Sequence, residues 1–362
     1  MSSELGNRLK ISLFGESHGN GIGAVIDGFP AGVRIDMDKL AAFTARRRPG
    51  RDKTSTARKE DDVPEILSGM LDGVTCGTPV AVVIRNTDQH SSDYKNVSHE
   101  ARPGHADYTG YVRYGGFNDV RGGGHFSGRL TAPLVFAGGM CIQYLEQHGI
   151  YVGAHLASVA GVEDKRFDPC SVTKEELKAP GEKKFPVIDD EAGEKMRDEI
   201  EKARLDSDSV GGTVEAAVIG MPAGTGSPIF DTVEGRLAYG YYGIPAVKGV
   251  SFGAGFDAPL MRGSENNDEF YMDNGVVRTR TNNHGGVLGG ITSGMPVTAL
   301  LAFKPTPSIA KPQHTIDYAE NKDTVINIRG RHDPCVAVRA VPVVEAVTAA
   351  VMMDMLLEEG VF

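Results

Sequence analysis

The segment from Arg102 to Arg129 constrains this chain more than any other. It holds four arginines, two histidines and eight glycines within twenty-eight residues. Glycine adds no side chain to a core and costs backbone entropy on folding, and arginine is seldom fully buried without a partner. A segment that accepts both costs is expected to surround an anion with backbone amides and guanidinium groups. The two histidines indicate proton transfer beside that anion.

The charge and cysteine content exclude several classes of protein. The chain has 362 residues and a formal net charge of −10, which disfavours both general nucleic-acid binding and a merely basic surface loop. Its four cysteines form no C-x-x-C pair, so no zinc ribbon or other metal site is predicted. We see no signal-peptide core and no apolar run that would span a bilayer, and we expect a cytoplasmic protein without membrane contacts.

Apolar periodicity and turn residues predict a mixture of strands and helices along one uninterrupted chain. The predicted strands are 9–14, 23–27, 78–85, 212–219 and 249–252, and the predicted helices are 36–47, 130–148, 190–205 and 342–358. Gly138 and Gly139 fit inside a helix only if another segment packs very close to them. Residues 162–186 are expected to form a surface excursion. No linker is evident, so we expect a single domain over residues 1–362.

Two short motifs near the N-terminus resemble known signatures without meeting their requirements. Residues 15–19 match the G-x-S-x-G nucleophile elbow of hydrolases, but that elbow needs a helix after the serine, and residues 22–27 are expected to be extended. Residues 19–24 match G-x-G-x-x-A, yet neither the helix nor the acidic residue of a dinucleotide site follows. Ser17 and His18 remain candidates for a functional site.

Further cationic and glycine-rich motifs extend the anion-site hypothesis. Five cations between residues 46 and 53 could cap a helix end or reach a dianionic substrate. Gly122–Gly124 precede a predicted helix, where a phosphate-binding nest is favoured over a flexible loop. Asp333 lies among cations and is expected to stay ionised as a base or an orienting group, although a turn-forming Asp-Pro pair is equally compatible.

The motifs together resemble those of the chorismate synthase family, in order and spacing over nearly the whole chain. They are G-E-S-H-G (15–19), R-R-R-P-G (46–50), R-P-G-H-A-D-Y (102–108), R-G-G-G (121–124), D-S-V-G-G (208–212), A-V-K-G-V (246–250), L-G-G-I-T-S-G (288–294), K-P-T-P-S (304–308) and G-R-H-D-P-C (330–335). Any one of these motifs would be weak alone.

The resemblance implies a phosphate lyase that converts 5-enolpyruvylshikimate 3-phosphate to chorismate in aromatic amino-acid biosynthesis. The reaction is an anti 1,4-elimination of phosphate that requires reduced FMN without net redox change. The implied fold is α+β, an α-β-β-α four-layer sandwich assembled as a homotetramer. No insertion that would add a flavin reductase is evident, so an external reductase is expected to supply the flavin.

The resemblance also implies roles for individual residues. His18 would protonate the departing phosphate, His105 would serve the protonation state of the flavin, and Asp333 would help the flavin accept the C6 proton. The residues implied in substrate binding are Ser17, Arg47, Lys53, Arg102 and Arg129. Those implied in flavin binding are His125, Phe126, Ser127, Ala246, Gly289, Lys304, Pro305, Thr306, Pro307, Ser308 and Arg331. Ser127 and Arg331 would also contact the substrate.

Two positions depart from the family pattern, and two other functions remain open. His125 and Phe126 stand where many members have arginine and serine, and Lys53 stands where many have arginine, so one fork-like contact becomes a point charge. The alternatives are a flavin oxidoreductase that consumes NAD(P)H and a phosphometabolite-binding module without proton chemistry.

Overall fold

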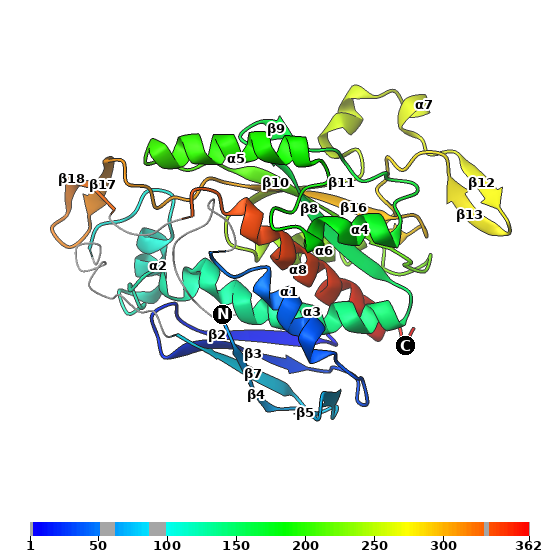
Figure 1. Cartoon of the computed structure of the whole chain (residues 1–362), viewed down its shortest axis with the longest axis horizontal. Coiled ribbons are helices and arrows are strands. Elements are labelled where there is room, and N and C mark those ends of the chain that lie inside the picture. The colour runs from blue at the N-terminus through cyan, green and yellow to red at the C-terminus, as the bar shows by residue number, and fades with distance from the viewer. Residues whose placement is uncertain (1–2, 51–61, 87–98, 329–332, 362) are drawn as a thin grey trace.

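Two five-stranded antiparallel sheets form the framework of the computed structural model, which describes residues 3–50, 62–86, 99–328 and 333–361 (Figure 1). The first sheet has the order β1 (Glu4–Leu5), β2 (Lys10–Gly15), β3 (Gly21–Asp27), β7 (Val80–Arg85) and β4 (Pro64–Ser68). The second has the order β11 (Val247–Phe252), β16 (Val297–Phe303), β10 (Gly212–Ile219), β8 (Tyr151–Val159) and β9 (Val162–Glu163).

The described chain also contains α-helices, short hairpins and 3₁₀ segments at Gly124–Phe126, Gly128–Leu130 and Gly255–Leu260. The helices are α1 (Met37–Ala45), α2 (Asp107–Tyr114), α3 (Thr131–Gln147), α4 (Lys174–Glu182), α5 (Asp190–Leu205), α6 (Val233–Tyr242), α7 (Gly263–Asn266) and α8 (Ala337–Glu358). The hairpins are β5 (Met70–Leu71) with β6 (Val74–Thr75), β12 (Phe270–Asp273) with β13 (Val276–Thr279), β14 (Val287–Leu288) with β15 (Ile291–Thr292), and β17 (Gln313–Asp317) with β18 (Lys322–Ile326).

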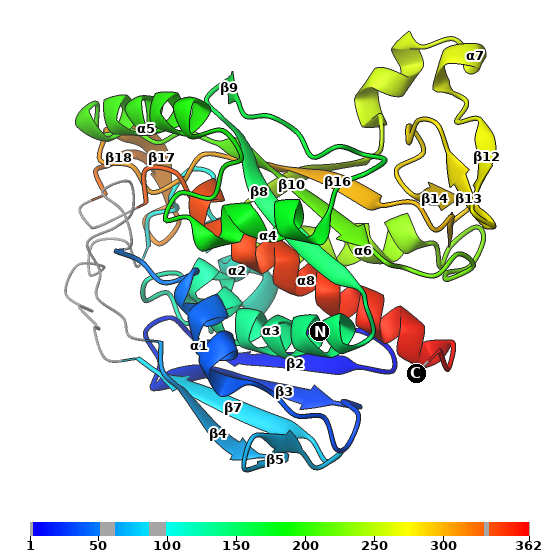
Figure 2. The same ribbon diagram turned by 45° about the vertical axis from the view of Figure 1, so that its right-hand side comes forward.

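Helices α3 and α8 pack against each other between the two sheets (Figures 1 and 2). Helix α3 contacts β2, β3 and β7 of the first sheet, and α8 contacts β8 and β10 of the second. The α+β class is therefore confirmed, while the order of layers differs from the expected α-β-β-α. The physical reason is that α3 and α8 are buried around most of their circumference, and a helix apolar on all sides has to be covered on all sides.

The two glycines inside α3 mark the closest helix contacts. A Cβ on Gly138 would lie 2.3 Å from the Cα of Ala346 in α8, and a Cβ on Gly139 would lie 2.6 Å from Cδ1 of Leu40 in α1. The prediction that another segment packs very close to these two glycines is thus confirmed. Helix α3 thus packs closely against both α1 and α8.

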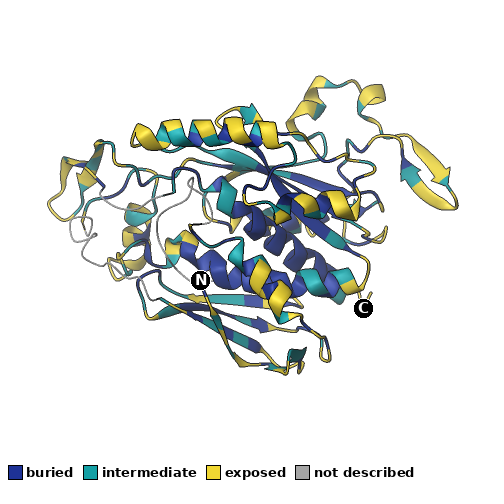
Figure 3. Cartoon of the chain, in the orientation of Figure 1, coloured by how far each residue is buried: buried dark blue, intermediate teal, exposed yellow. Residues whose placement is uncertain are grey.

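Helix α8 begins at Ala337, five residues before the predicted start at Pro342, so that boundary is wrong. Ala337, Ala340 and Val341 are buried, and this packing outweighs the amide lost at an internal proline. By length and composition α8 could cross a membrane, but 94% of its most apolar stretch is buried inside the structure. It is the central core helix, dark blue along most of its length in Figure 3.

Residues 162–186 are not merely a surface excursion, and that prediction is wrong. Phe167, Val172 and Leu177 are buried and pack with Ala217 of β10. They cover the face of the second sheet that points away from α8. Their apolar side chains are widely spaced among charged residues, which hides them from a periodicity argument. By contrast α5 has the predicted bounds and exposes its charged face (Figure 3).

Candidate active site

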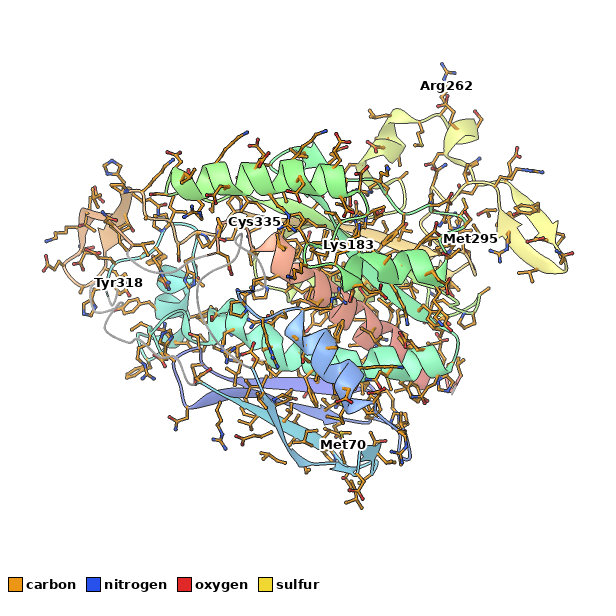
Figure 4. All side chains as sticks on the ribbon, viewed as in Figure 1. Met70, Lys183, Arg262, Met295, Tyr318 and Cys335 are labelled. Carbon is orange, nitrogen blue, oxygen red and sulfur yellow. The ribbon has the colours of Figure 1, made fainter. Side chains whose placement is uncertain are left out.

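A cavity of about 510 Å³ lies where the ends of several elements meet. Its wall is formed by the end of β2, the end of α1, the start of α2, the loop before α3, the start of β11, the segment after β16 and the start of α8. Cys335, labelled in Figure 4, marks the chain just before α8. The volume lies within the usual range for small-molecule sites.

Ser17 and His18 enter the cavity on the turn after β2, which is held by the glycine-rich loop. The amide of Ser17 donates to the carbonyl of Gly124 over 3.1 Å. The Ser17 hydroxyl lies 3.2 Å from Nδ1 of His18, and both residues are buried. A Cβ on Gly122 would lie only 2.1 Å from His18 Nδ1. Gly122 thus leaves room for the imidazole of His18. The sequence had predicted a different role for these glycines, a nest that binds phosphate.

His105 is fixed by a carboxylate at the start of α2. Its Nδ1 lies 2.8 Å from Oδ1 of Asp107, and Asp107 also accepts two hydrogen bonds from the Arg102 guanidinium, over 2.6 and 2.7 Å. Burial works to raise the pKa of Asp107, but hydrogen bonds from Arg102 and His105 hold it far below its usual value. Arg102 NH2 also lies 3.2 Å from this nitrogen, but the contact with Asp107 is shorter. The ionised carboxylate can only accept, so Nδ1 of His105 carries the proton and Nε2 is left to act in the cavity.

A buried carboxylate joins two more of the predicted arginines. Arg47 and Arg129 are each 5% exposed, and both form ion pairs with Asp62. Arg47 also donates to the carbonyl of Gly128 and the hydroxyl of Thr131. Burial works to raise the pKa of Asp62, and the two arginines lower it below its usual value. The guanidinium groups are therefore held in place before any ligand arrives.

Lysines and a strained backbone form the opposite wall. Lys248 and Lys304 both line the cavity, and burial together with the charge of Lys248 lowers the pKa of Lys304. Ala246 has a φ of 76°, the left-handed region that few residues other than glycine adopt. Its carbonyl accepts a hydrogen bond from the Lys304 amide over 3.0 Å. The Oγ1 of Thr306 is buried in the same wall without a hydrogen-bond partner among the described residues.

Asp333 faces the cavity at the start of α8 and is paired with Arg339. The distance from Arg339 NH1 to Asp333 Oδ2 is 2.5 Å, and Arg339 Nε donates to the carbonyl of Arg47 over 3.0 Å. Arg339 and Lys248 line the cavity but were not assigned to it from the sequence. Lys248 stood in a quoted motif, A-V-K-G-V, and its cationic side chain between glycine and small residues was the available signal.

The cavity is electropositive. Within the described part of the chain, six cations line it, namely Arg47, Arg102, Arg129, Lys248, Lys304 and Arg339. Three carboxylates pair with members of this set, namely Asp62, Asp107 and Asp333, which leaves three positive charges in excess, six minus three. A cavity with such an excess favours a ligand with several negative charges.

Most of the predicted site residues meet in this one cavity. Those lining it are Ser17, His18, Arg47, Arg102, His105, Phe126, Ser127, Arg129, Ala246, Lys304, Thr306, Pro307, Ser308 and Asp333. Pro305 does not line it, and Gly289 lies in the turn between β14 and β15. His125 instead donates from Nδ1 to the carbonyl of Gly15 and bonds through Nε2 to Ser3. Lys53 and Arg331 lie outside the described residues.

Comparison with known proteins gives the family. The family model for chorismate synthase matches residues 9–357. The chain belongs to the chorismate synthase family. It is 49% identical to the chorismate synthase of Pyrococcus abyssi over 354 residues, covering 97% of both chains. It is 46% identical to that of Methanocella arvoryzae, covering 98% of this chain and 94% of the relative.

Structural comparison agrees with the chorismate synthase assignment. A crystal structure of chorismate synthase superimposes with a TM-score of 0.76 at 29% identity and covers 98% of this chain and 93% of the other. The resemblance seen in the sequence motifs is therefore confirmed, and with it the expectation of an enzyme with chorismate synthase activity.

Proposed function

We propose that this chain converts 5-enolpyruvylshikimate 3-phosphate to chorismate by anti 1,4-elimination of phosphate, in the cavity described above. The observation that carries the proposal is the convergence of two histidines, His18 and His105, with three buried arginines on one electropositive wall. A substrate with one phosphate and two carboxylates matches the excess of cations. The histidines match the need to move protons near neutral pH.

Arg47, Arg102 and Arg129 are the residues that we assign to the substrate anions. Each is anchored by Asp62 or Asp107, so the guanidinium groups are held in position in advance and little side-chain entropy is lost on binding. Lys53 is assigned to the same task from the sequence alone. Two carboxylates among three guanidinium groups leave a net positive charge for the ligand.

His18 is assigned as the acid that protonates the departing phosphate. Its Nδ1 lies 3.2 Å from the Ser17 hydroxyl, which orients the ring in the wall of the cavity. His105 presents Nε2 as the second proton carrier, because Asp107 holds its Nδ1. Asp333 is assigned as the carboxylate that would help the flavin accept the C6 proton at the α8 end of the cavity, where Arg339 keeps it in place.

The opposite wall fits reduced FMN. Lys248 and Lys304 supply charge for a phosphate, the unpartnered Oγ1 of Thr306 supplies a hydroxyl for a polar chain, and Ile244 and Val343 supply apolar surface for a ring system. The residues that would hold the cofactor are Phe126, Ser127, Ala246, Lys248, Lys304, Thr306, Pro307 and Ser308. His125, Gly289, Pro305 and Arg331 are assigned from the resemblance alone. When bound, reduced FMN supplies electron density and a proton acceptor to the elimination.

We further propose that the whole chain forms one domain, assembles as a homotetramer, works in the cytoplasm and receives reduced flavin from an external reductase. Exposed apolar side chains support burial against other copies, since Phe230, Phe256 and Leu260 are 96%, 84% and 83% exposed. Light scattering of the purified chain tests the assembly.

One anaerobic assay tests the proposed reaction. The purified protein is mixed with reduced FMN and 5-enolpyruvylshikimate 3-phosphate, and phosphate, chorismate and flavin absorbance are followed together. Equal release of phosphate and chorismate without flavin oxidation is expected. Stoichiometric consumption of NAD(P)H or net flavin oxidation would indicate an oxidoreductase instead. Binding without turnover would indicate a phosphometabolite-binding module.

A further inference from the structure

A second cluster of reactive side chains lies outside the cavity. Asp268 follows α7, His284 follows β13 and Ser293 follows β15, and none of the three lines the cavity. In Figures 1 and 2, α7, β12 and β13 project from the end of the molecule opposite β17 and β18. In Figure 4, Met295 lies near the base of that projection and Tyr318 lies at the other end. The chorismate synthase chemistry proposed above does not use this cluster.

Asp268 and His284 form a partly buried carboxylate–imidazole pair. Oδ2 of Asp268 bonds to Nδ1 of His284 and accepts the His284 amide over 2.9 Å. Oδ1 accepts from the Thr281 hydroxyl over 2.6 Å and from the Asn283 amide over 2.8 Å. Burial works to raise the pKa of Asp268, but these hydrogen bonds outweigh it and lower the pKa below its usual value. The carboxylate is ionised, so Nδ1 of His284 carries a proton.

Ser293 completes the arrangement. With Nδ1 protonated, Nε2 of neutral His284 has a lone pair, and it lies 2.9 Å from Oγ of Ser293. In this neutral tautomer the serine hydroxyl can donate to the imidazole. Its backbone is fixed by a hydrogen bond from the Ser293 amide to the carbonyl of Gly286 over 2.9 Å. A nucleophile bonded to a base, with that base bonded to an orienting carboxylate, is the arrangement that activates serine in hydrolases.

We propose that Asp268, His284 and Ser293 form a second site that hydrolyses small carboxylic esters, separate from chorismate formation. This triad is not at the G-x-S-x-G match of residues 15–19, which lies in the first cavity. It is assembled across three loops, which is why no short sequence pattern reveals it.

The surroundings of Ser293 allow a small acyl group to reach it. Ser293 is partly exposed and Gly294 is exposed. The φ of Gly294 is 86°, which places the serine on a sharp turn, and a Cβ there would be no closer than 3.6 Å to any neighbour. Among the described residues no hydrogen bond uses the Gly294 amide. The amide that follows the nucleophile is a standard donor to the oxyanion of acyl transfer.

The reaction balances without a redox partner. Oγ of Ser293 attacks the ester carbonyl, the bond from carbonyl carbon to the alkoxy oxygen breaks, and His284 passes the serine proton to the leaving alcohol. Water then attacks the acyl-serine, gives one proton to His284 and yields the carboxylic acid, and His284 returns that proton to Ser293. The net change is ester plus water to acid plus alcohol.

A fluorophosphonate probe on the full-length protein tests the proposal, with peptide mapping by mass spectrometry. One probe on Ser293 is expected, with loss of p-nitrophenyl acetate hydrolysis in step with labelling. Ser264, exposed on α7, is an internal control that should stay unlabelled because exposure alone does not activate a serine. This comparison uses the unaltered chain, so it does not depend on how variants fold.

Variants separate activation from loop packing. Asp268→Asn and His284→Gln should slow labelling of Ser293 by about 100-fold or more, the usual size of general-base assistance. Ser293→Ala should abolish labelling and leave chorismate formation unchanged. The proposal fails if Ser293 stays unlabelled in the unaltered protein, or if Asp268→Asn labels at the same rate, because the triad would then only hold its loops together.

Discussion

The backbone of Gly122 lies where a side chain would collide with the imidazole of His18. A Cβ at this position would lie 2.1 Å from both Nδ1 and Cε1 of His18 and 2.9 Å from Oγ of Ser17. A Cβ on the neighbouring Gly123 would lie in ordinary van der Waals contact with His105, 3.4 Å from its Nε2. The triple glycine therefore lies between the two histidines, and Gly122 limits where the His18 ring can sit.

The first prediction concerns Gly122→Ala. The methyl group would displace His18, and the residue would also be strained at its φ of 69°. We expect kcat to fall about 100-fold, because a displacement near 1 Å commonly costs that much. Steady-state rates of chorismate release measure it. Gly263→Ala is the matched control, since a Cβ there meets nothing within 4 Å, and equal activity of the two variants would contradict the steric argument.

Replacing His105 tests proton transfer directly. His105→Ala removes the ring that presents Nε2 to the cavity, while Arg102 keeps its bonds to Asp107. We expect turnover to slow by roughly 100- to 10,000-fold, the range for general acid–base catalysis, with the substrate Kd near normal. Single-turnover kinetics and equilibrium binding separate the two quantities. Unchanged turnover would remove His105 from the mechanism.

Asp107→Asn tests how His105 is held. An amide can donate as well as accept, so Nδ1 of His105 is no longer forced to carry the proton. We expect the His105 ring to populate both tautomers in ¹⁵N NMR spectra and kcat to fall at least about tenfold. Asp119→Asn, which removes an outer carboxylate paired with Arg121, is the control. An unaltered His105 tautomer in Asp107→Asn would show that another group sets it.

Most residues of the predicted site gather in one cavity, whereas the order of the layers was not predicted. Motifs placed His18, His105 and three arginines in one site because chemistry restricts which residues can serve there, and all of them line one cavity. The position of α3 and α8 between the sheets was not predicted. The sequence of an apolar helix has the same pattern whether the helix covers one sheet or lies between two. Glu345 illustrates the limit: it is a charged residue within α8, yet it is 4% exposed and paired with Arg46.

Ion-pair partners that lie far apart in the sequence also could not be predicted from it. Asp62 joins Arg47 and Arg129 across 15 and 67 positions, and nothing in its neighbourhood marks it as a partner for either. Asp107 stood in a quoted motif beside His105, so the spacing of two residues was an available signal. Ion pairs between residues far apart in the sequence can thus be identified only from the three-dimensional structure. Pairs within one turn can be predicted from their spacing.

The last prediction concerns pH and a buried histidine away from both sites. His155 in β8 has no exposed surface, and its ring nitrogens lie 3.0 Å from Oδ2 of Asp164 and 2.7 Å from Oε2 of Glu215. Burial works to lower the pKa of His155, but hydrogen bonds from the ring to both carboxylates outweigh it and raise the pKa above its usual value. The imidazolium is the form that satisfies both carboxylates.

Because the folded pKa of His155 is raised, its stabilising contribution is complete below the unfolded value near 6.5 and is lost as pH rises through the folded value. Between these values the free energy of unfolding should fall by up to about 1.4 kcal/mol per pH unit. Urea titrations from pH 6 to 9 at one protein concentration measure this slope. His155→Gln binds no proton here and should flatten it, whereas equal slopes in the variant and the unaltered protein would assign the pH dependence to other groups.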